Sequence, residues 1–296
     1  NVRASLGIIH ALRGNTGAGV QAHLASLSVR SQLLPAGHGA IAQSLHNLAV
    51  LRADMGDVKA AIALWTHALP MTWTAGDGHT LSRMLPRLAV AWADAGHREL
   101  ALFWGRQAVL HIQGQRTALR VLDPALQRNF ASEKRRAFVD LAKWEVASSR
   151  PEAAEQVMAL LKDEEYFDFL GRDPSAAVPP AALPAIPARQ AKLHEEWQAF
   201  QREATNRATE VAVLQAGLRT GSLDTERRNR LQVLQDQQAA LRGDATRWLV
   251  NLGQLLQTSP SDLPASKSAP VELNAPETPL PPGTAAVQYV VGEQSL

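Results

Sequence analysis

The sequence contains no cysteine among its 296 residues. The chain therefore forms no disulfide, offers no thiolate ligand to a metal, and holds no cysteine nucleophile. No pair of carboxylates stands at a spacing that favours general acid and base chemistry either. We expect this chain by itself not to be an enzyme and to carry no catalytic residue.

Neither sign of charge is in large excess, because the 30 Lys and Arg residues nearly balance the 28 Asp and Glu residues, for a net charge of +2. A balance this close favours neither a nucleic-acid nor a membrane partner. No run approaches the roughly 18 to 20 apolar residues of a membrane helix, and the first residues lack the layout of a signal peptide. Arginine outnumbers lysine 24 to 6, as in GC-rich bacterial genes. We expect a cytoplasmic, bacterial protein.

Proline is concentrated in two clusters, Pro174 to Pro187 with five residues and Pro260 to Pro282 with seven. Proline lacks a backbone donor and fixes φ, so neither cluster fits inside a helix or a central strand. We read the clusters as linkers. The predicted divisions are a helical repeat array at 1–171, a Pro/Ala linker at 172–188, a helical hairpin at 189–257, a Pro-rich linker at 258–282 and a final segment at 283–296.

The first block contains an internal repeat of 40 residues, seen when the sequence is shifted against itself. Seven residues then coincide with identical ones: Leu45, Leu48, Ala49, Val50, Gly56, Ala61 and Ala68 with Leu85, Leu88, Ala89, Val90, Gly96, Ala101 and Ala108. The spacing places the apolar residues on one helix face, and the glycine falls where the chain must turn. Each repeat is predicted to be a pair of helices, and pairs of this kind bury their apolar faces by stacking.

A third copy of the pair is predicted around Phe138, Leu141 and Ala142, with a turn before Pro151. Proline suits the first turn of the second helix. A fourth, degenerate copy is predicted ahead of the others, around Gly14 and residues 20–34.

The repeat resembles tetratricopeptide (TPR) repeats. The likeness lies in Leu-Ala on the first helix, Gly56-Asp57 at the turn, and Trp65 and Ala68 on the second helix. The 40-residue length and the connectors 36–39 and 76–79 are similar to those of the kinesin-light-chain type. The resemblance implies an all-α fold, a TPR-like α-solenoid, over the first 160 residues or so.

In the second block, apolar residues recur at intervals of three and four on both sides of Thr220-Gly221-Ser222. Leu193, Trp197 and Phe200 begin one series, and Leu231 and Leu234 begin the other. We expect a long antiparallel hairpin with arms of about 45 Å at 1.5 Å per residue. Arg207 and Gln238 interrupt the apolar seams, so uniform packing is not expected.

Two short motifs extend the resemblance. Tyr166-Phe167-Asp168-Phe169 follows the last repeat, and Gly283-Thr284-Ala285 opens a strand-like run that ends at Val291. The order of array, hairpin and strand is similar to that of bacterial TPR–CHAT proteins, in which a caspase- and separase-like cysteine peptidase domain follows. The resemblance implies a short C-terminal β-strand that begins a truncated α/β domain, the CHAT-like domain, as a partner of the array. The family's catalytic His and Cys would lie beyond that strand.

A groove formed by the first helix of each pair is the predicted binding surface for a protein or peptide partner. An asparagine there, Asn47, can pair with both the N–H and the C=O of an extended peptide. Arginines favour carboxylates on the ligand. The predicted partner-binding residues are Gln43, His46, Asn47, Val50, Arg83, Arg87, Arg136 and Lys143.

Three other features could suggest a ligand site, but each is better explained by a structural role. Gly14 to Gly19 lacks the strand and lysine of a phosphate-binding loop, so we expect a turn between helices. His194-Glu195-Glu196 lacks a second histidine four residues on, so a solvated helix face is expected in place of a zinc site. His38 and His79 recur in equivalent connectors, where capping is favoured over metal binding. No cofactor or metal is expected.

Together these features predict the regulatory, partner-binding region of a CHAT-type cysteine peptidase. The alternative is a stand-alone TPR adaptor with no enzyme attached. An exposed strand such as residues 285–291 has no use in an adaptor and would favour aggregation.

Overall fold

The computed structural model describes residues 5–7, 9–10, 13–114, 124–170, 184–222 and 224–257, with their side chains except at 124–134 and 163–170. Across these ranges the regular structure is helical and contains no strand. The predicted all-α class is therefore confirmed for the described chain. The predicted strand and CHAT-like segment, the second Pro-rich linker and most of the first lie outside the described residues, as do the side chains of Tyr166 to Phe169.

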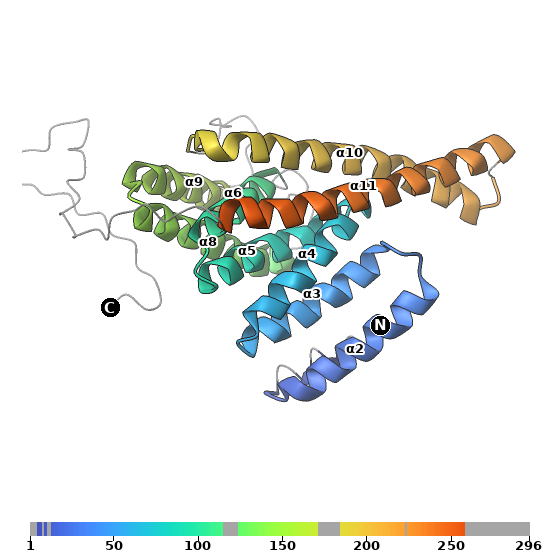
Figure 1. The fold of residues 1–296 in the computed structure, drawn as a ribbon, viewed down its shortest axis with the longest axis horizontal. Coiled ribbons are helices and arrows are strands. Elements are labelled where there is room, and N and C mark those ends of the chain that lie inside the picture. Colours follow the sequence, from blue (N-terminus) through green and yellow to red (C-terminus); the bar gives the residue numbers. More distant parts are fainter. Residues whose placement is uncertain are drawn as a thin grey trace, which may run out of the picture. The chain divides into compact units, whose positions relative to one another are not determined.

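Successive antiparallel helices extend from Thr16 to Gly114 (Figure 1). They are α2 (Thr16–Leu33), α3 (Gly39–Asp54), α4 (Val58–Thr74), α5 (Gly78–Asp94) and α6 (Arg98–Gly114). Each packs against the next, and the starts of α4 and α6 are separated by the predicted 40 residues. Gly56 and Gly96, at the turns within the two pairs, both have a φ of 81°, a left-handed conformation that glycine adopts without strain.

Side chains cap several of these helices, and one of the caps, His38, was predicted from the sequence. Asn15 Oδ1 accepts a hydrogen bond from Ala18 N at the start of α2, so the glycine-rich segment 14–19 is a turn and a cap. His38 Nδ1 accepts from Ala40 N at the start of α3, which confirms capping. Asp57 and Asp77 cap α4 and α5 in the same manner. Each cap satisfies one of the backbone donors that a helix start leaves unpaired.

The third predicted pair is α8 (Pro124–Ala147) and α9 (Pro151–Leu170). Pro151 is the first residue of α9, as expected, and the turn before it holds Ser149 with a φ of 57°. Phe138 and Leu141 on α8 are fully buried, and so is Val157 on α9. The apolar spacing read from the sequence thus defines the contact between these two helices.

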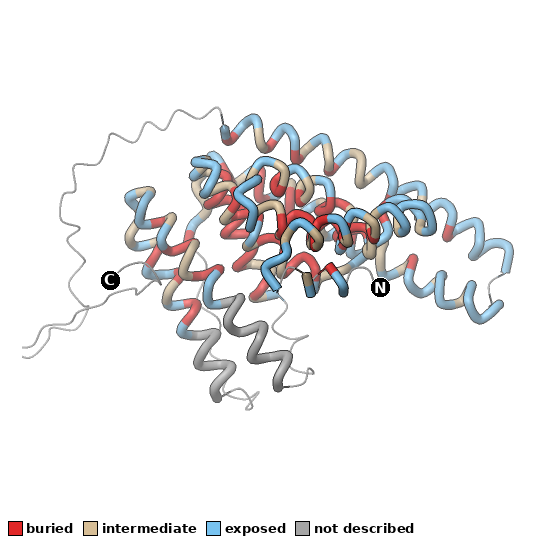
Figure 2. Tube along the Cα trace, turned by 90° about the horizontal axis from the view of Figure 1, so that it is seen from below, coloured by how far each residue is buried: buried red, intermediate tan, exposed pale blue. Residues whose placement is uncertain are grey.

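The predicted long hairpin is present as α10 (Ala188–Arg219) and α11 (Thr225–Gln257), helices of 32 and 33 residues. Near the turn the arms meet through Val211, Leu231 and Leu234, with Leu214 beside them. Arg207 breaks the seam as anticipated, because its guanidinium donates to Gln237 O at 2.9 Å instead of packing. In Figure 2 the end of the hairpin near the turn is exposed on most of its surface.

The chain forms two compact units. One compact unit combines Asn1–Thr117 with Ile186–Thr258, and the other combines Ala118–Ala185 with Ser259–Leu296. The hairpin therefore belongs with helices α2 to α6, not to a domain of its own. The physical reason is that α10 and α11 pack on α4 and α6 through a shared aromatic core.

That core brings together six aromatic side chains from four helices. Trp197 of α10 lies 4.5 Å from Trp73 of α4 and 5.0 Å from Trp104 of α6, measured between ring centroids, both in edge-to-face geometry. Phe103, Phe200 and Trp248 complete the cluster. Aromatic pairs of this geometry are worth about 0.5–1.5 kcal/mol each beyond their buried area. The hairpin is thereby held to the repeats by a large apolar contact.

Candidate functional site

The first helices of two repeats, α3 and α5, carry the predicted binding residues of the larger unit. We call Gln43, Asn47, Val50, Arg83 and Arg87 the A-helix face. Gln43 and Arg87 are exposed, and the other three are half-buried. The side-chain amide of Asn47 forms no hydrogen bond within the described part of the chain, so its donor and acceptor are available to a ligand.

His46 does not belong to this surface, although the sequence placed it there. Only 1% of the residue is exposed, and Trp65 Nε1 donates to its Nδ1 at 3.1 Å. The helical spacing placed His46 in the groove beside Asn47, but its ring turns inward and accepts the hydrogen bond from the tryptophan of α4. His46 is a core residue that satisfies the indole N–H of Trp65.

The electrostatics of His46 show that α5 directs positive charge toward α3. The pKa of His46 is lowered to about 3; burial is the largest cause, and the charges of Arg83, Arg87 and His79 act in the same direction. Arg87 also lies 4.0 Å from Asp54 Oδ1 across the two helices. Since both of these side chains are about half exposed, this ion pair is weak and can be replaced by a carboxylate from a partner.

The second helices of the same pairs, α4 and α6, are covered by the hairpin. Arg106 of α6, which is 2% exposed, donates to Gln190 Oε1 at 2.6 Å, and Gln190 Nε2 donates to Glu99 Oε2 at 2.7 Å. These bonds satisfy polar groups that burial would otherwise leave unpaired. They fix the start of α10 against α6.

The prediction of a solvated face at His194 is wrong. The residue is only 9% exposed, with Gln107 Nε2 and Gln198 Nε2 each 2.9 Å from one of its ring nitrogens. Burial lowers its pKa. The local sequence gave a polar helix, but packing against α6 buried this side of it.

The hairpin also reaches the connectors between repeats. Gln238 Nε2 donates to Thr74 O at 2.9 Å, which explains the glutamine in an apolar seam: it satisfies a carbonyl at the end of α4. Arg242 Nη2 donates to Ala36 O at 3.1 Å. A Cβ on Gly37, whose φ is 86°, would collide with the guanidinium of Arg242, and one on Gly76 would lie 3.3 Å from Ala208 Cβ. The glycines of both connectors therefore allow the hairpin to approach.

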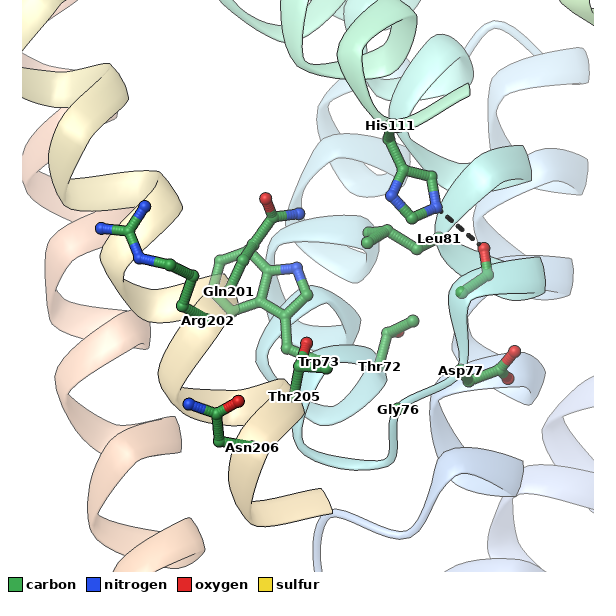
Figure 3. A pocket seen from close by; sticks show the side chains of 11 residues that line it. Thr72, Trp73, Gly76, Asp77, Leu81, His111, Gln201, Arg202, Thr205 and Asn206 are labelled. Carbon is green, nitrogen blue, oxygen red and sulfur yellow. Dashed lines mark hydrogen bonds between the residues drawn. The ribbon is translucent and has the colours of Figure 1, made fainter. Parts of the chain in front are cut away.

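A cavity of about 400 Å³ lies between α10 and the repeat helices (Figure 3). Thr72, Trp73 and Gly76 come from the end of α4 and its connector, Leu81 from α5 and His111 from α6. Gln201, Arg202, Thr205 and Asn206 of α10 form the opposite wall. His111 Nε2 is 3.0 Å from Gly78 O, and burial is the larger influence on its lowered pKa.

The remaining predicted residues, Arg136 and Lys143, belong to the smaller unit. Both are exposed on α8, and Arg136 Nε lies 3.6 Å from Asp140 Oδ2 one turn along the helix. The structure therefore brings Asn47, Val50, Arg83 and Arg87 into one surface of the larger unit. The two basic residues of α8 form a surface of the smaller one.

No group of three His, Cys, Asp or Glu residues that could hold a metal ion occurs among the described residues. With no cysteine anywhere in the sequence, the chain lacks a catalytic cysteine. Within the described ranges, no helix is both long enough and apolar enough to cross a membrane.

No family model matches the chain, and no curated protein shows a significant match. Any function must therefore be argued from the residues themselves.

Sequence reasoning missed the residues that join the hairpin to the repeats. Trp197 and Trp248 each fitted an apolar series of the hairpin, and Trp73 carried no signal of its own, so nothing marked the three as members of one cluster. The available signal was the group of polar residues in apolar seams, Gln190, His194 and Gln238, since polar residues at such positions need partners from another element.

Proposed function

We propose that this chain is a protein-interaction and regulatory region that binds a partner on the A-helix face and controls a CHAT-type cysteine peptidase domain. The observation that carries the proposal is the asymmetry of the larger unit. The hairpin covers the second helices α4 and α6, while Asn47, Arg83 and Arg87 remain accessible on the first helices. The 40-residue helical pairs with left-handed glycines at their turns support a TPR-like solenoid as the framework.

The chemistry of the A-helix face favours an extended peptide that carries carboxylates. The amide of Asn47 can bond both a backbone N–H and a backbone C=O of such a peptide. Arg83 forms no ion pair with a described residue, and Arg87 has only the 4.0 Å contact with Asp54. Both guanidiniums can therefore form charge-assisted hydrogen bonds with acidic side chains of the ligand.

Control of a peptidase domain would operate through the hairpin. Helices α3 and α5 bind the ligand, and each is paired with a helix, α4 or α6, on which α10 and α11 rest. A ligand that binds more tightly to one arrangement of α3 and α5 would shift the position of the hairpin. The hairpin ends at Gln257, ahead of the Pro-rich linker and the strand-like motif at residues 283–291.

Selection of a displayed random-peptide library on the immobilised chain tests the binding part of the proposal. We expect enrichment of acidic peptides, and at least tenfold weaker binding of them to the double variant Arg83→Glu and Arg87→Glu. The matched control is Arg227→Glu with Arg228→Glu, the same charge change on exposed residues near the hairpin turn. Equal loss in both variants would mean that net charge alone, not this face, selects the peptides.

The regulatory part is tested on the full-length protein with its peptidase domain, by measuring cleavage with and without an enriched peptide. We expect the peptide to change the cleavage rate in the unmodified protein but not in the Arg83→Glu, Arg87→Glu variant. Binding without any change in cleavage would favour the adaptor alternative.

A further inference from the structure

The cavity between α10 and the repeats contains a buried hydrogen-bond donor without a partner. Trp73 is 5% exposed, and its indole nitrogen makes no hydrogen bond in the described part of the chain. In Figure 3 the indole lies against the cavity with its nitrogen on the side of Leu81 and His111. A buried N–H that lacks an acceptor reduces stability, so a ligand that supplies an acceptor gains a bond that the protein does not make.

His111 supplies an acceptor in the same cavity. Its Nε2 lies 3.0 Å from Gly78 O, and because a carbonyl oxygen can only accept, Nε2 carries the proton. Burial lowers the pKa of His111, so the ring is neutral near pH 7 and Nδ1 keeps its lone pair. Figure 3 shows this second nitrogen on the side of Gln201, toward the cavity.

The charged side chains around the cavity are not available to a ligand in its inner part, beside Trp73 and His111. Both carboxylate oxygens of Asp77 accept bonds from Thr80, from its N at 2.9 Å and its Oγ1 at 2.6 Å. Arg202 is exposed and points away from Trp73 in Figure 3. The Thr72 hydroxyl donates to Ala68 O. The inner surface thus presents the Trp73 donor and the His111 acceptor, together with the side-chain amide of Gln201, beside the apolar indole and Leu81.

We propose that this cavity binds the amide group of a small neutral molecule. The amide oxygen accepts from Trp73 Nε1, and the amide N–H donates to His111 Nδ1. A volume of about 400 Å³ holds such a molecule, since a water in the liquid occupies only about 30 Å³. Because Gln201 and Thr205 of α10 form one wall, the bound molecule would contact both the hairpin and the repeats. The site is separate from the A-helix face.

The test uses N-methylacetamide, the simplest amide with both a carbonyl and an N–H. In ¹⁵N-labelled protein the indole N–H signal of Trp73 is followed during the titration. We expect a saturable shift of this signal with a midpoint on the order of 10 mM, the affinity available to a ligand of five heavy atoms. N,N-dimethylacetamide keeps the carbonyl but has no N–H, and should bind about fivefold more weakly.

Single substitutions test whether N-methylacetamide binds in this cavity. Trp73→Phe keeps a ring against Trp197 but removes the donor, and ligand-observed NMR should show at least fivefold weaker binding. The control Trp92→Phe alters an α5 tryptophan that packs on His97, and should bind N-methylacetamide as the unmodified protein does. The Arg83→Glu, Arg87→Glu variant should also bind it unchanged, so this proposal and the proposed function fail independently.

Three results would overturn the proposal: a shift that never saturates, equal binding of the two amides, or unchanged binding by Trp73→Phe. The first would mean that the cavity holds only water, the second that no bond to His111 Nδ1 forms, and the third that no bond from Trp73 Nε1 forms. If Trp73→Phe does not fold, the comparison of the two amides on the unmodified protein decides the matter alone.

Discussion

Replacing Gly37 by alanine is expected to weaken the attachment of the hairpin to the repeats. Two costs arise. The φ of 86° at this position strains any residue with a Cβ, by about 1–2 kcal/mol. The new methyl group would also occupy the space of the Arg242 guanidinium, which donates to Ala36 O at 3.1 Å and lies 3.4 Å from Thr74 Oγ1.

The second cost is the loss of these bonds, because the flexible arginine can swing away from the clash. Hydrogen bonds from a charged donor contribute about 1.5–3 kcal/mol when buried. Arg242 is only partly buried, so we expect about 1–2 kcal/mol in total from this cause. The same substitution at Gly56, with a φ of 81° and no atom near the added Cβ, carries the strain alone.

The assay is chemical denaturation followed by circular dichroism for Gly37→Ala, Gly56→Ala, Arg242→Ala and the double variant Gly37→Ala, Arg242→Ala. We expect Gly37→Ala to cost about 1–2 kcal/mol more than Gly56→Ala. In the Arg242→Ala background this excess should disappear. Equal costs at the two glycines in the unmodified background would refute the contact between Arg242 and the first connector.

Three further predictions concern separate parts of the chain. As the pH falls below about 6.5, the ordinary pKa of histidine, the imidazole of His46 is protonated in the unfolded state but not in the folded state, where its pKa is about 3. This group should therefore lower the free energy of unfolding by about 1.4 kcal/mol per pH unit between 6.5 and 3. Denaturation of His46→Gln should show a pH dependence shallower by up to that amount, and identical slopes would contradict the burial of His46. Ala61→Trp or Ala101→Trp places a large ring at a fully buried position between helices and should cost on the order of 1–3 kcal/mol or more, measured by thermal denaturation; a cost near zero would contradict close packing there. Ser149→Gly should stabilise the smaller unit by about 1 kcal/mol, because Ser149 has a φ of 57°; a lower melting temperature would show that its side chain matters more than its backbone strain.

The helices and their pairing could be predicted because their signals are local. The repeated Leu-Ala pattern, the glycines at 56 and 96 and the turn before Pro151 each depend on neighbouring residues, and each is confirmed. The hairpin was predictable for the same reason, from apolar steps on both sides of Gly221. Gln238 stood out as an interruption, but the sequence could not show that Thr74 O was its partner.

The association of the hairpin with the repeats could not be predicted, because it joins residues far apart in the chain. Trp73 and Trp197 are separated by more than a hundred positions, and each looks like an ordinary core residue of its own helix. The same limit explains His46 and His194. Helical periodicity assigns a face, but only the packing of a second helix decides whether that face is buried.

Part of the candidate site was predictable. The wheel positions of Asn47, Arg83 and Arg87 followed from the helix period, and the structure places them on adjoining helices. The cavity was not predictable, since Trp73, His111 and Gln201 meet only because α10 lies across the ends of α4 and α6.

An engineered disulfide tests most directly whether the hairpin lies on the second helices and so leaves the A-helix face open. A Cβ on Gly76 would lie 3.3 Å from Ala208 Cβ, close to the roughly 3.5–4.5 Å of a disulfide, and the chain has no other cysteine to compete. After mild oxidation, mass spectrometry of Gly76→Cys, Ala208→Cys should find the two peptides of one chain linked. The control Gly56→Cys, Ala208→Cys carries the same left-handed glycine change and should stay reduced. Failure of the first pair to link, or equal linking in both, would contradict this position of the hairpin.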